Sequence, residues 1–370
     1  MRVGGLLAAF ALLLLGHSKT WASQYNLIDL NALLGSNAGF GSSAQAINNS
    51  GQVTGNAIDS TGFGQAFVYD GSAMHTLGAF IIPGGAMGGS SGMSISAAGH
   101  VVGASIKAGT TYHGYFYTGG ALADLGTLSN GTDSYAIGIN DSDQIVGNAH
   151  VTDGNYHVFL YSGGAMTDIG TLAPNYSADT YGINNLGQIV GEANSPTAAY
   201  HAFRYSNGVM QDLGVLPGGR TSAGTAINNL GHVAGHADNS LRNDQAFLWT
   251  GSTLADLGTL GGSTSWANGI NNLDRVVGWS LVSPSVQHAF LYSGGTMQDL
   301  NSLIDPSSGW KLTNATAIND LGEIVGQGTD PQGHASAFLL TPTPEPGSIA
   351  LIALMTGGLL IRRRVVRTDR

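Results

Sequence analysis

The sequence predicts an all-β protein, a seven-bladed β-propeller with four-stranded blades. Three observations predict this fold. The composition is rich in glycine and poor in charge, and a unit of about 44 residues occurs seven times. In addition, one fragment of that unit is missing at the end of the array and is present at its beginning.

The composition excludes the main alternatives to an all-β fold. Glycine occupies 57 of 370 positions and only 10% of residues are charged, which disfavours a helical bundle. Apolar residues make up 42% of the chain, too many for a disordered one. Because cysteine is absent, disulfides and thiolate metal sites are excluded. We therefore expect stability to come from the packing of short strands joined by tight turns.

The charge of the central region bears on the kind of partner. Between positions 23 and 341 the chain has six basic and 21 acidic residues, a net charge of about −15. Such a surface repels a phosphate backbone, so nucleic acid is not an expected partner.

Two sequence markers recur with the same spacing. One is a strand-like segment that ends in glycine, and the other is a His-Ala-Phe-like segment with a central aromatic residue. Successive copies of each marker are 48, 44, 44, 44, 43 and 48 residues apart. The glycines are Gly55, Gly103, Gly147, Gly191, Gly235, Gly278 and Gly326, and the aromatics are Phe67, Tyr115, Phe159, Phe203, Phe247, Phe290 and Phe338. We conclude that the chain contains seven copies of one structural unit.

A third marker, Asp-Leu-Gly-Thr-Leu, shows how the array is arranged. It follows the aromatic segment in most units, as at Asp124, but is missing after the seventh. A related segment, Leu27 to Asn31, lies at the front instead. We therefore expect this front segment to complete the sheet that positions 318–340 begin, a common way to close a propeller. An open β-solenoid or an array of β-sandwiches would not require this complementarity.

Local chemistry predicts antiparallel strands within each unit. Gln188-Ile189-Val190 is a β-prone run, and Asn184 to Gly187 before it form a hairpin turn with glycine at a position of positive φ. Where that glycine changes, Asp143 or Asp274 replaces it, and aspartate tolerates this conformation.

The units resemble the HAF repeat of bacterial extracellular proteins. The tripeptide that names this repeat occurs at His201-Ala202-Phe203 and at His288-Ala289-Phe290, and other copies depart from it slightly. The resemblance extends from Leu27 to Leu340 and implies an extracellular location, without a defined activity.

The N-terminal 22 residues have the pattern of a secretory signal peptide. Arg2 precedes an uncharged apolar run, and Ala22 provides a small residue before a cleavage point at Ser23. A retained membrane anchor is the alternative. We predict a signal peptide at 1–22, a propeller at 23–341 and a separate tail at 342–370.

The tail combines a proline-rich linker, an apolar run at 348–361 and an arginine cluster. The apolar run predicts a short transmembrane helix with its basic end in the cytoplasm. The three parts resemble the PEP-CTERM sorting signal of Gram-negative bacteria, which implies recognition by an exosortase-like processing enzyme. A permanent single-pass anchor is the alternative. The residues that would be recognised are Pro344, Glu345, Pro346, Arg362, Arg363 and Arg364.

Three repeated polar patterns invite a chemical interpretation. Histidines recur at one repeat position, but glutamine or serine replaces them elsewhere, so we expect hydrogen bonds rather than metal binding. An aspartate opens the third marker in nearly every unit, and we expect it to accept backbone N–H groups at a turn. Asn140 to Asp143 loosely suggest a calcium loop, but the set is incomplete and a hairpin turn is favoured. The histidines are His113, His157, His201 and His288, and the aspartates are Asp29, Asp124, Asp168, Asp212, Asp256 and Asp299.

Function is expected where the repeat is interrupted. The two 48-residue spacings mark insertions that contain Phe80, Ile81 and Ile82 in one case and Trp310 in the other. Exposed apolar residues in loops on a rigid scaffold are typical of binding sites. Simple packing of these loops is the alternative.

The sequence thus predicts an exported protein of the cell envelope, its surface or the extracellular matrix. We expect it to bind glycan, exopolysaccharide or envelope proteins through propeller loops, and to need no metal or other cofactor. The alternative is a secreted propeller hydrolase or lyase that acts on polysaccharide. No catalytic residue is assigned, because no cluster of acidic or basic residues that departs from the repeat is evident in the sequence.

Overall fold

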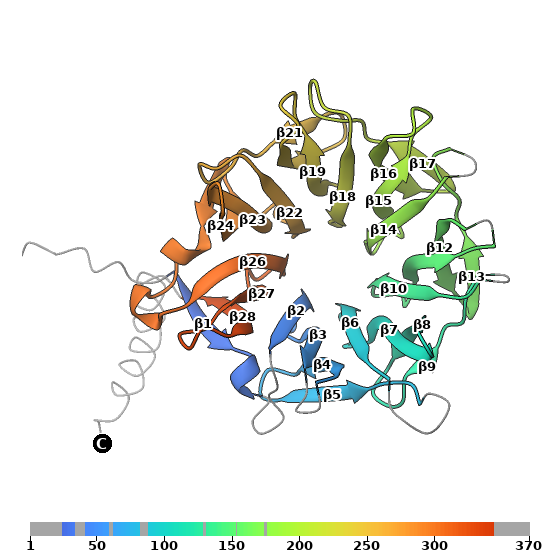
Figure 1. Ribbon diagram of the computed structural model, residues 1–370, viewed down its shortest axis with the longest axis horizontal. Helices are drawn as coiled ribbons and strands as arrows, with labels where there is room; N and C mark the ends of the chain where they lie inside the picture. The colour runs from blue at the N-terminus through green and yellow to red at the C-terminus, as the bar shows by residue number, and fades with distance from the viewer. Residues whose placement is uncertain are drawn as a thin grey trace, which may run out of the picture.

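A computed structural model describes residues 24–33, 41–58, 62–81, 88–128, 131–152, 154–173 and 176–343. These residues form seven four-stranded antiparallel sheets arranged as blades around a central axis (Figure 1). The predicted all-β, seven-bladed propeller is confirmed. The predicted signal helix and apolar tail helix lie outside the described residues. Within the described ranges, no helix has the length and apolar character needed to cross a membrane.

Each blade has the same strand order from the axis to the rim. The innermost strands are β2 (Ser42–Ile47), β6 (Ser90–Ile95), β10 (Ser134–Ile139), β14 (Ala178–Ile183), β18 (Ser222–Ile227), β22 (Ser265–Ile270) and β26 (Lys311–Ile318). The second strands are β3 (Val53–Ile58), β7 (Val101–Ala108), β11 (Ile145–His150), β15 (Ile189–Asn194), β19 (Val233–Asp238), β23 (Val276–Ser283) and β27 (Ile324–Thr329).

The outer half of each blade contains the aromatic strand and the rim strand. The third strands are β4 (Gly64–Tyr69), β8 (Thr111–Tyr117), β12 (Tyr156–Ser162), β16 (Tyr200–Ser206), β20 (Asp244–Trp249), β24 (Val286–Ser293) and β28 (Ala335–Pro342). The rim strands are β5 (Met74–Gly78), β9 (Ala123–Asp124), β13 (Ala165–Asp168), β17 (Val209–Asp212), β21 (Leu254–Asp256), β25 (Thr296–Asp299) and β1 (Tyr25–Asp29). Two 3-10 helices, η2 (Leu300–Ser302) and η3 (Pro306–Ser308), lie between β25 and β26. Blades 1 to 6 begin at β2, β6, β10, β14, β18 and β22, and blade 7 contains β26, β27, β28 and β1.

The ring closes as the displaced third marker predicts. Strand β1 pairs antiparallel with β28, and Leu27 lies opposite Leu340. The first strand of the described chain is therefore the rim strand of the last blade, and Figure 1 shows β1 beside β28. Strand β28 ends at Pro342, one residue beyond the predicted domain boundary, because Pro342 still lies opposite Tyr25. The first residue of the predicted proline-rich linker is therefore the last residue of a propeller strand.

The two repeat markers meet in the core of each blade. Gly147 of β11 lies opposite Phe159 of β12. A Cβ atom at Gly147 would collide with the carbonyl oxygen of Tyr135 on the innermost strand and would lie 2.6 Å from Phe159 Cζ. Glycine is therefore required by the close approach of the innermost strand as well as by the ring. The seven aromatic residues of this marker are all fully buried. Loss of one such ring in a packed core costs about 3–5 kcal/mol, which explains why every unit keeps an aromatic residue there.

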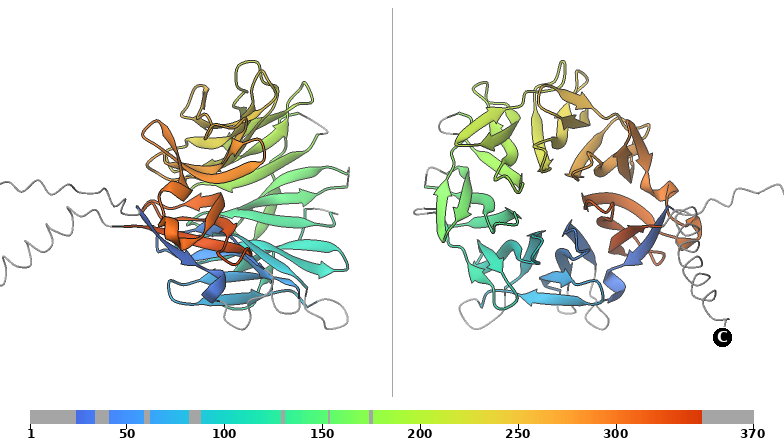
Figure 2. Two further views of the ribbon diagram at one scale, coloured as in Figure 1. Left: turned by 60° about the vertical axis from the view of Figure 1, so that its left-hand side comes forward. Right: turned by 180° about the vertical axis from the view of Figure 1, so that it is seen from behind.

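The alternation of strand direction gives the disc two different faces, which Figure 2 shows edge-on and from behind. We call one of them the asparagine face, after the asparagine that begins the turn between the first and second strands in most blades. It contains these turns and those between the third and fourth strands, each five residues or fewer. We call the other the loop face, because it contains the connections from one blade to the next, which are eight to twelve residues long. Binding residues on long connections must therefore lie on the loop face.

The closing strand gives a first testable prediction. Leu30 N–H donates to Ala337 O and Thr343 N–H donates to Gln24 O. Because hydrogen-bonded pairs alternate along an antiparallel ladder, Ile28 N–H points toward β28 and Leu27 N–H points away. We expect Ile28→Pro to lower the free energy of unfolding by about 1–3 kcal/mol more than Leu27→Pro, since it leaves a carbonyl of β28 without a donor.

Both side chains are partly buried, so the two variants are matched for lost packing. Urea denaturation followed by tryptophan fluorescence measures the difference. Equal destabilisation by the two prolines would contradict ring closure through β1.

Candidate functional site

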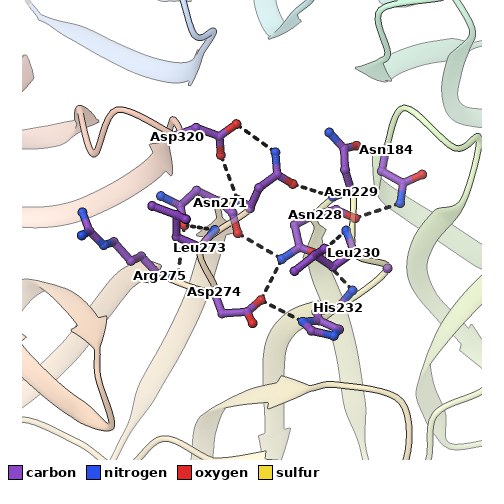
Figure 3. Close-up of polar contacts among 12 residues, drawn as sticks. Asn184, Asn228, Asn229, Leu230, His232, Asn271, Leu273, Asp274, Arg275 and Asp320 are labelled. Carbon is purple, nitrogen blue, oxygen red and sulfur yellow. Dashed lines mark hydrogen bonds and ion pairs between the residues drawn. The ribbon is translucent and has the colours of Figure 1, made fainter.

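A ring of asparagines joins the blades on the asparagine face (Figure 3). Each ring asparagine follows the innermost strand, and its Oδ1 accepts N–H groups of its own turn; Asn228 Oδ1 does so from Leu230 and His232, both at 3.0 Å. Its Nδ2 donates to the main chain of the next blade. These bonds run from Asn48 to Ser96, Asn140 to Asn184, Asn184 to Asn228, Asn228 to Asn271, Asn271 to Asn319 and Asn319 to Asn48.

The next residue in each turn forms a second ring. Its Oδ1 accepts the backbone N–H of the equivalent residue in the preceding blade, as Asp320 does from Asn272 at 2.8 Å. Burial opposes ionisation of Asp320, but hydrogen bonds from Asn272 and Asn49 outweigh it and lower the pKa of Asp320. Blade 2 interrupts both rings, because Ser96 and Ala97 stand at the two positions.

These rings line a cavity of about 180 Å³ at the mouth of the central channel. Most of their side-chain polar groups already bond to a neighbouring blade or to their own turn. We therefore interpret the asparagine rings as the part of the scaffold that fixes the position of each blade relative to its neighbours.

The repeated histidines and aspartates are also structural, as expected. His157 Nδ1 lies 2.7 Å from Asp168 Oδ2, while Asp168 Oδ1 accepts the N–H of Gly170. The same His–Asp arrangement occurs at His113 and Asp124, at His201 and Asp212, and at His288 and Asp299. In blade 7 Ser336 donates to Asp29 instead, so a hydroxyl replaces the imidazole in the same contact.

Asn140 to Asp143 form a turn, which confirms the hairpin interpretation. Asp143 has a φ of 56°, and its carboxylate lies 2.8 Å from His100 Nδ1 of the preceding blade. Asp141 accepts the N–H of Ala97. Across the described ranges, no three His, Asp or Glu side chains are grouped closely enough to hold a metal ion.

The insertion loops differ from the expected exposed apolar loops. Phe80 is buried in the core between blades 1 and 2, where its backbone N–H donates to Ser105 Oγ. Ile81 is 74% exposed, whereas Trp310 is only half-exposed because it packs against the core of blade 7. Ile82 and the six sorting-signal residues Pro344, Glu345, Pro346, Arg362, Arg363 and Arg364 lie outside the described residues. Among the predicted loop residues that the structure describes, Ile81 alone keeps the exposure on which the loop hypothesis depended.

The strongest departures from the repeat lie on the loop-face half of the innermost and second strands. In each innermost strand, the residue just before the one that faces the marker glycine lies opposite a residue of the second strand, and this pair differs in every blade. The pairs are Ser43–Asn56, Ser91–Ala104, Tyr135–Asn148, Asp179–Glu192, Ala223–His236, Trp266–Trp279 and Asn314–Gln327. These positions vary while the glycine and aromatic markers of the same strands persist, which indicates that the scaffold does not dictate them.

Blade 4 contains an acidic cluster that sequence analysis missed. Asp179 and Glu192 lie opposite each other, and Tyr181 Oη donates to Glu192 Oε1 at 2.9 Å. Burial raises the pKa of both carboxyl groups, and Asp179 adds to the rise at Glu192 while the Tyr181 hydrogen bond opposes it. Burial and the nearby Glu192 also raise the pKa of Tyr181. The expectation that no blade-specific acidic cluster exists is therefore wrong.

An aromatic stack lies in the next two blades around the ring, blades 5 and 6. The rings of His236 and Trp266 are parallel within 4°, with centroids 3.8 Å apart, and the Trp266–Trp279 centroids are 5.6 Å apart. Trp266 Nε1 donates to Asp244 Oδ2. Both indoles are partly exposed. In blade 5 the small Ala223 takes the place that Trp266 has in blade 6, so no bulky side chain faces Glu192 from that position.

The central channel connects these groups. A cavity of about 260 Å³ is lined by the fourth residue of most innermost strands, and this position also varies between blades. Its polar members include Gln45, Tyr181, Thr225 and Asn268. We define the recognition site as Asp179, Tyr181, Glu192, His236, Trp266 and Trp279. Together they offer carboxyl groups and the partly exposed indoles of Trp266 and Trp279 on the same side of the channel.

Comparisons with known proteins show the fold. No protein-family model matches the sequence, and no curated protein matches it. A puromycin-hydrolyzing peptidase of Mycobacterium tuberculosis is 12% identical, with a TM-score of 0.56 over 86% of this chain and 54% of the peptidase. A prolyl endopeptidase structure is 9% identical, with a TM-score of 0.50 over 86% and 52%. This chain spans about half the length of both, and at these identities the likeness extends to the propeller alone.

The asparagine ring gives a second prediction. Asn228→Ala removes the donor to Asn271 O, in a buried bond, and the acceptor for two partly buried N–H groups of its own turn. We expect it to lower the free energy of unfolding by about 2–4 kcal/mol, since several buried polar groups lose their partners. Leu230→Ser, at an exposed position of the same turn, is the control and should change stability by less than about 0.5 kcal/mol. Similar losses in the two variants would contradict a scaffold role for the ring.

His236 gives a third prediction, on pH. Burial lowers its pKa to about 4 from the usual 6.5 of a histidine, although Asp244 opposes this shift. The folded state therefore binds fewer protons than the unfolded chain between these values, and stability falls as the pH decreases through this window. Because one pKa unit corresponds to about 1.4 kcal/mol, the loss attributable to His236 is up to about 3 kcal/mol.

We expect His236→Gln to lose less stability than wild type between pH 7 and 4, as measured by chemical denaturation at each pH. His75→Gln, at an exposed site, is the control and should follow wild type. An unchanged pH slope in His236→Gln would contradict the burial of a neutral imidazole.

Proposed function

We propose that this chain is an exported cell-envelope protein that binds a glycan at the recognition site on its loop face. Export rests on the N-terminal pattern at 1–22, and surface sorting rests on the resemblance of 342–370 to an exosortase substrate. The seven-bladed fold supports this proposal, because it provides a rigid support for a site made from several blades. The resemblance of the units to HAF repeats supports an extracellular location.

The observation behind glycan binding is the aromatic stack beside carboxyl and amide groups. Sugar rings present apolar C–H faces and a rim of hydroxyls, and partly exposed indoles such as Trp266 and Trp279 match the former. Asp179, Glu192 and Asn268 provide acceptors and donors for the hydroxyls. The acidic body disfavours an anionic polysaccharide, so the ligand class is a neutral or amino sugar polymer.

A second candidate is a polysaccharide hydrolase or lyase. The specific observation in its favour is the facing pair Asp179 and Glu192, whose pKa values are both raised by burial. A carboxyl group with a raised pKa releases its proton less readily and is better suited to act as a general acid, and two carboxyl groups are the usual requirement of glycoside hydrolysis. This pair makes hydrolysis a more specific alternative than the sequence suggested.

The fourth prediction tests binding and hydrolysis together. Oligosaccharides of neutral, amino and acidic type are titrated against the protein, and the products are examined by mass spectrometry. We expect binding of a neutral or amino oligosaccharide without cleavage, and about tenfold weaker binding by Trp266→Ala, the loss of roughly 1.4 kcal/mol of ring contact.

Leu230→Ala, on the asparagine face, is the matched control and should bind as wild type does. Cleavage that Glu192→Gln abolishes would replace binding by hydrolysis as the function. Binding that Trp266→Ala leaves unchanged would place the ligand elsewhere.

A further inference from the structure

Four leucines project from the asparagine face in consecutive blades. They occupy one repeat position, the residue before the positive-φ turn residue, and each is 59–68% exposed. Blades 1 to 3 have Ser50, Ala98 and Ser142 at this position. The leucine arc, as we call it, consists of Leu186, Leu230, Leu273 and Leu321 in blades 4 to 7.

The fold does not require leucine at this position. What the turn uses is the backbone N–H, which donates to the ring asparagine, and Ser50 and Ser142 make the same bond as Leu186. The leucine side chains therefore expose apolar surface to water on one side of the disc. Isolated exposed leucines are ordinary, but four at one repeat position in adjacent blades form a continuous apolar edge.

The described chain also ends on this face. A Cβ atom at Gly322 would lie 3.6 Å from Pro342 Cγ, so the end of β28 lies beside the turn that contains Leu321. Only four residues, 344–347, separate Thr343 from the apolar segment 348–361. At about 3.3 Å per residue they span about 13 Å. An apolar segment inserted in a bilayer would therefore hold the asparagine face close to that bilayer.

The rest of the asparagine face suits a flat boundary. Its turns are short, and its carboxylates are engaged within the protein rather than projecting. Asp320 accepts from Asn272 and Asn49, and Asp274 accepts from Asn228. Glu323, Asp141 and Asp143 likewise have partners on neighbouring turns or in their own turn. The leucines stand at the tips of these turns, where they can enter an apolar layer while the carboxylates remain paired.

We propose that the asparagine face lies on a lipid bilayer, with the leucine arc in the interfacial layer and the recognition site facing away. This proposal rests on the proposed function, in that segment 348–361 must insert. The asparagine face has more carboxylates than basic groups. Because the carboxylates repel anionic headgroups, we expect this face to prefer a bilayer of zwitterionic lipid. The recognition site is then held open to polymers outside the membrane.

The experiment uses single-cysteine reporters, because the chain contains no cysteine. Leu230 on the asparagine face and Leu241 on the loop face belong to the same blade, and their side chains are 59% and 77% exposed. The two reporters are Leu230→Cys and Leu241→Cys. Each full-length variant is labelled with an environment-sensitive fluorophore and reconstituted in phosphatidylcholine vesicles that carry shallow nitroxide-labelled lipid. We expect several-fold stronger quenching at position 230 than at position 241, and weaker quenching at 230 when phosphatidylserine is added.

Vesicle flotation separates the failure of the inference from the failure of the proposed function. If the protein does not float with vesicles, segment 348–361 does not insert, and both the membrane-facing orientation and the proposed anchoring are wrong. Protein that floats but is quenched equally at the two positions overturns the membrane-facing orientation while anchoring stands. Shielding of position 230 that needs no lipid and increases with protein concentration identifies a second copy as the occupant, and also overturns the proposal.

Discussion

Ring closure through β1 and β28 is the constraint on which the other features depend. Seven blades enclose one channel only if the last blade is complete, and its rim strand comes from the front of the described chain. Closure brings Asn319 against Asn48, so the asparagine ring continues across the junction of the chain's two ends. The same closure fixes the position of each blade around the axis, and therefore the order in which the carboxyl groups of blade 4, His236 of blade 5 and the indoles of blade 6 follow one another.

Strand direction then separates two tasks. The innermost and third strands of every blade end on the asparagine face, where short turns and carboxamides join blade to blade. The opposite ends of the same strands reach the loop face, where side chains are free to differ because neither the glycine nor the aromatic marker lies there. This explains why the recognition site can have Asp179, His236 and Trp266 in neighbouring blades without loss of the common fold. It also explains why the leucine arc and the end of β28 both lie on the asparagine face.

The candidate site was only partly predictable. Positions that depart from the repeat were the right place to look for binding residues. The sequence analysis looked only at insertions, however, and these contain Phe80, which is buried. The informative signal was substitution within strands of unchanged length, at Asp179, Glu192 and their equivalents. A position-by-position alignment of the seven units would have found it. The stacking of His236 on Trp266 could not have been read from the chain, because the two residues belong to different blades and meet only through packing around the axis.

The sequence by itself determined the number of blades, their turns and the closing strand, because each follows from local chemistry repeated at a fixed interval. Gly147 is required by its two neighbouring strands, which bring Tyr135 O and the Phe159 ring against it, and Asp143 can replace glycine since its turn needs only a positive φ. Only the tertiary structure decided which side chains share a face, which apolar loops are buried and which carboxyl groups resist ionisation. Those properties depend on neighbours in other blades, and such neighbours are set by the curvature of the ring.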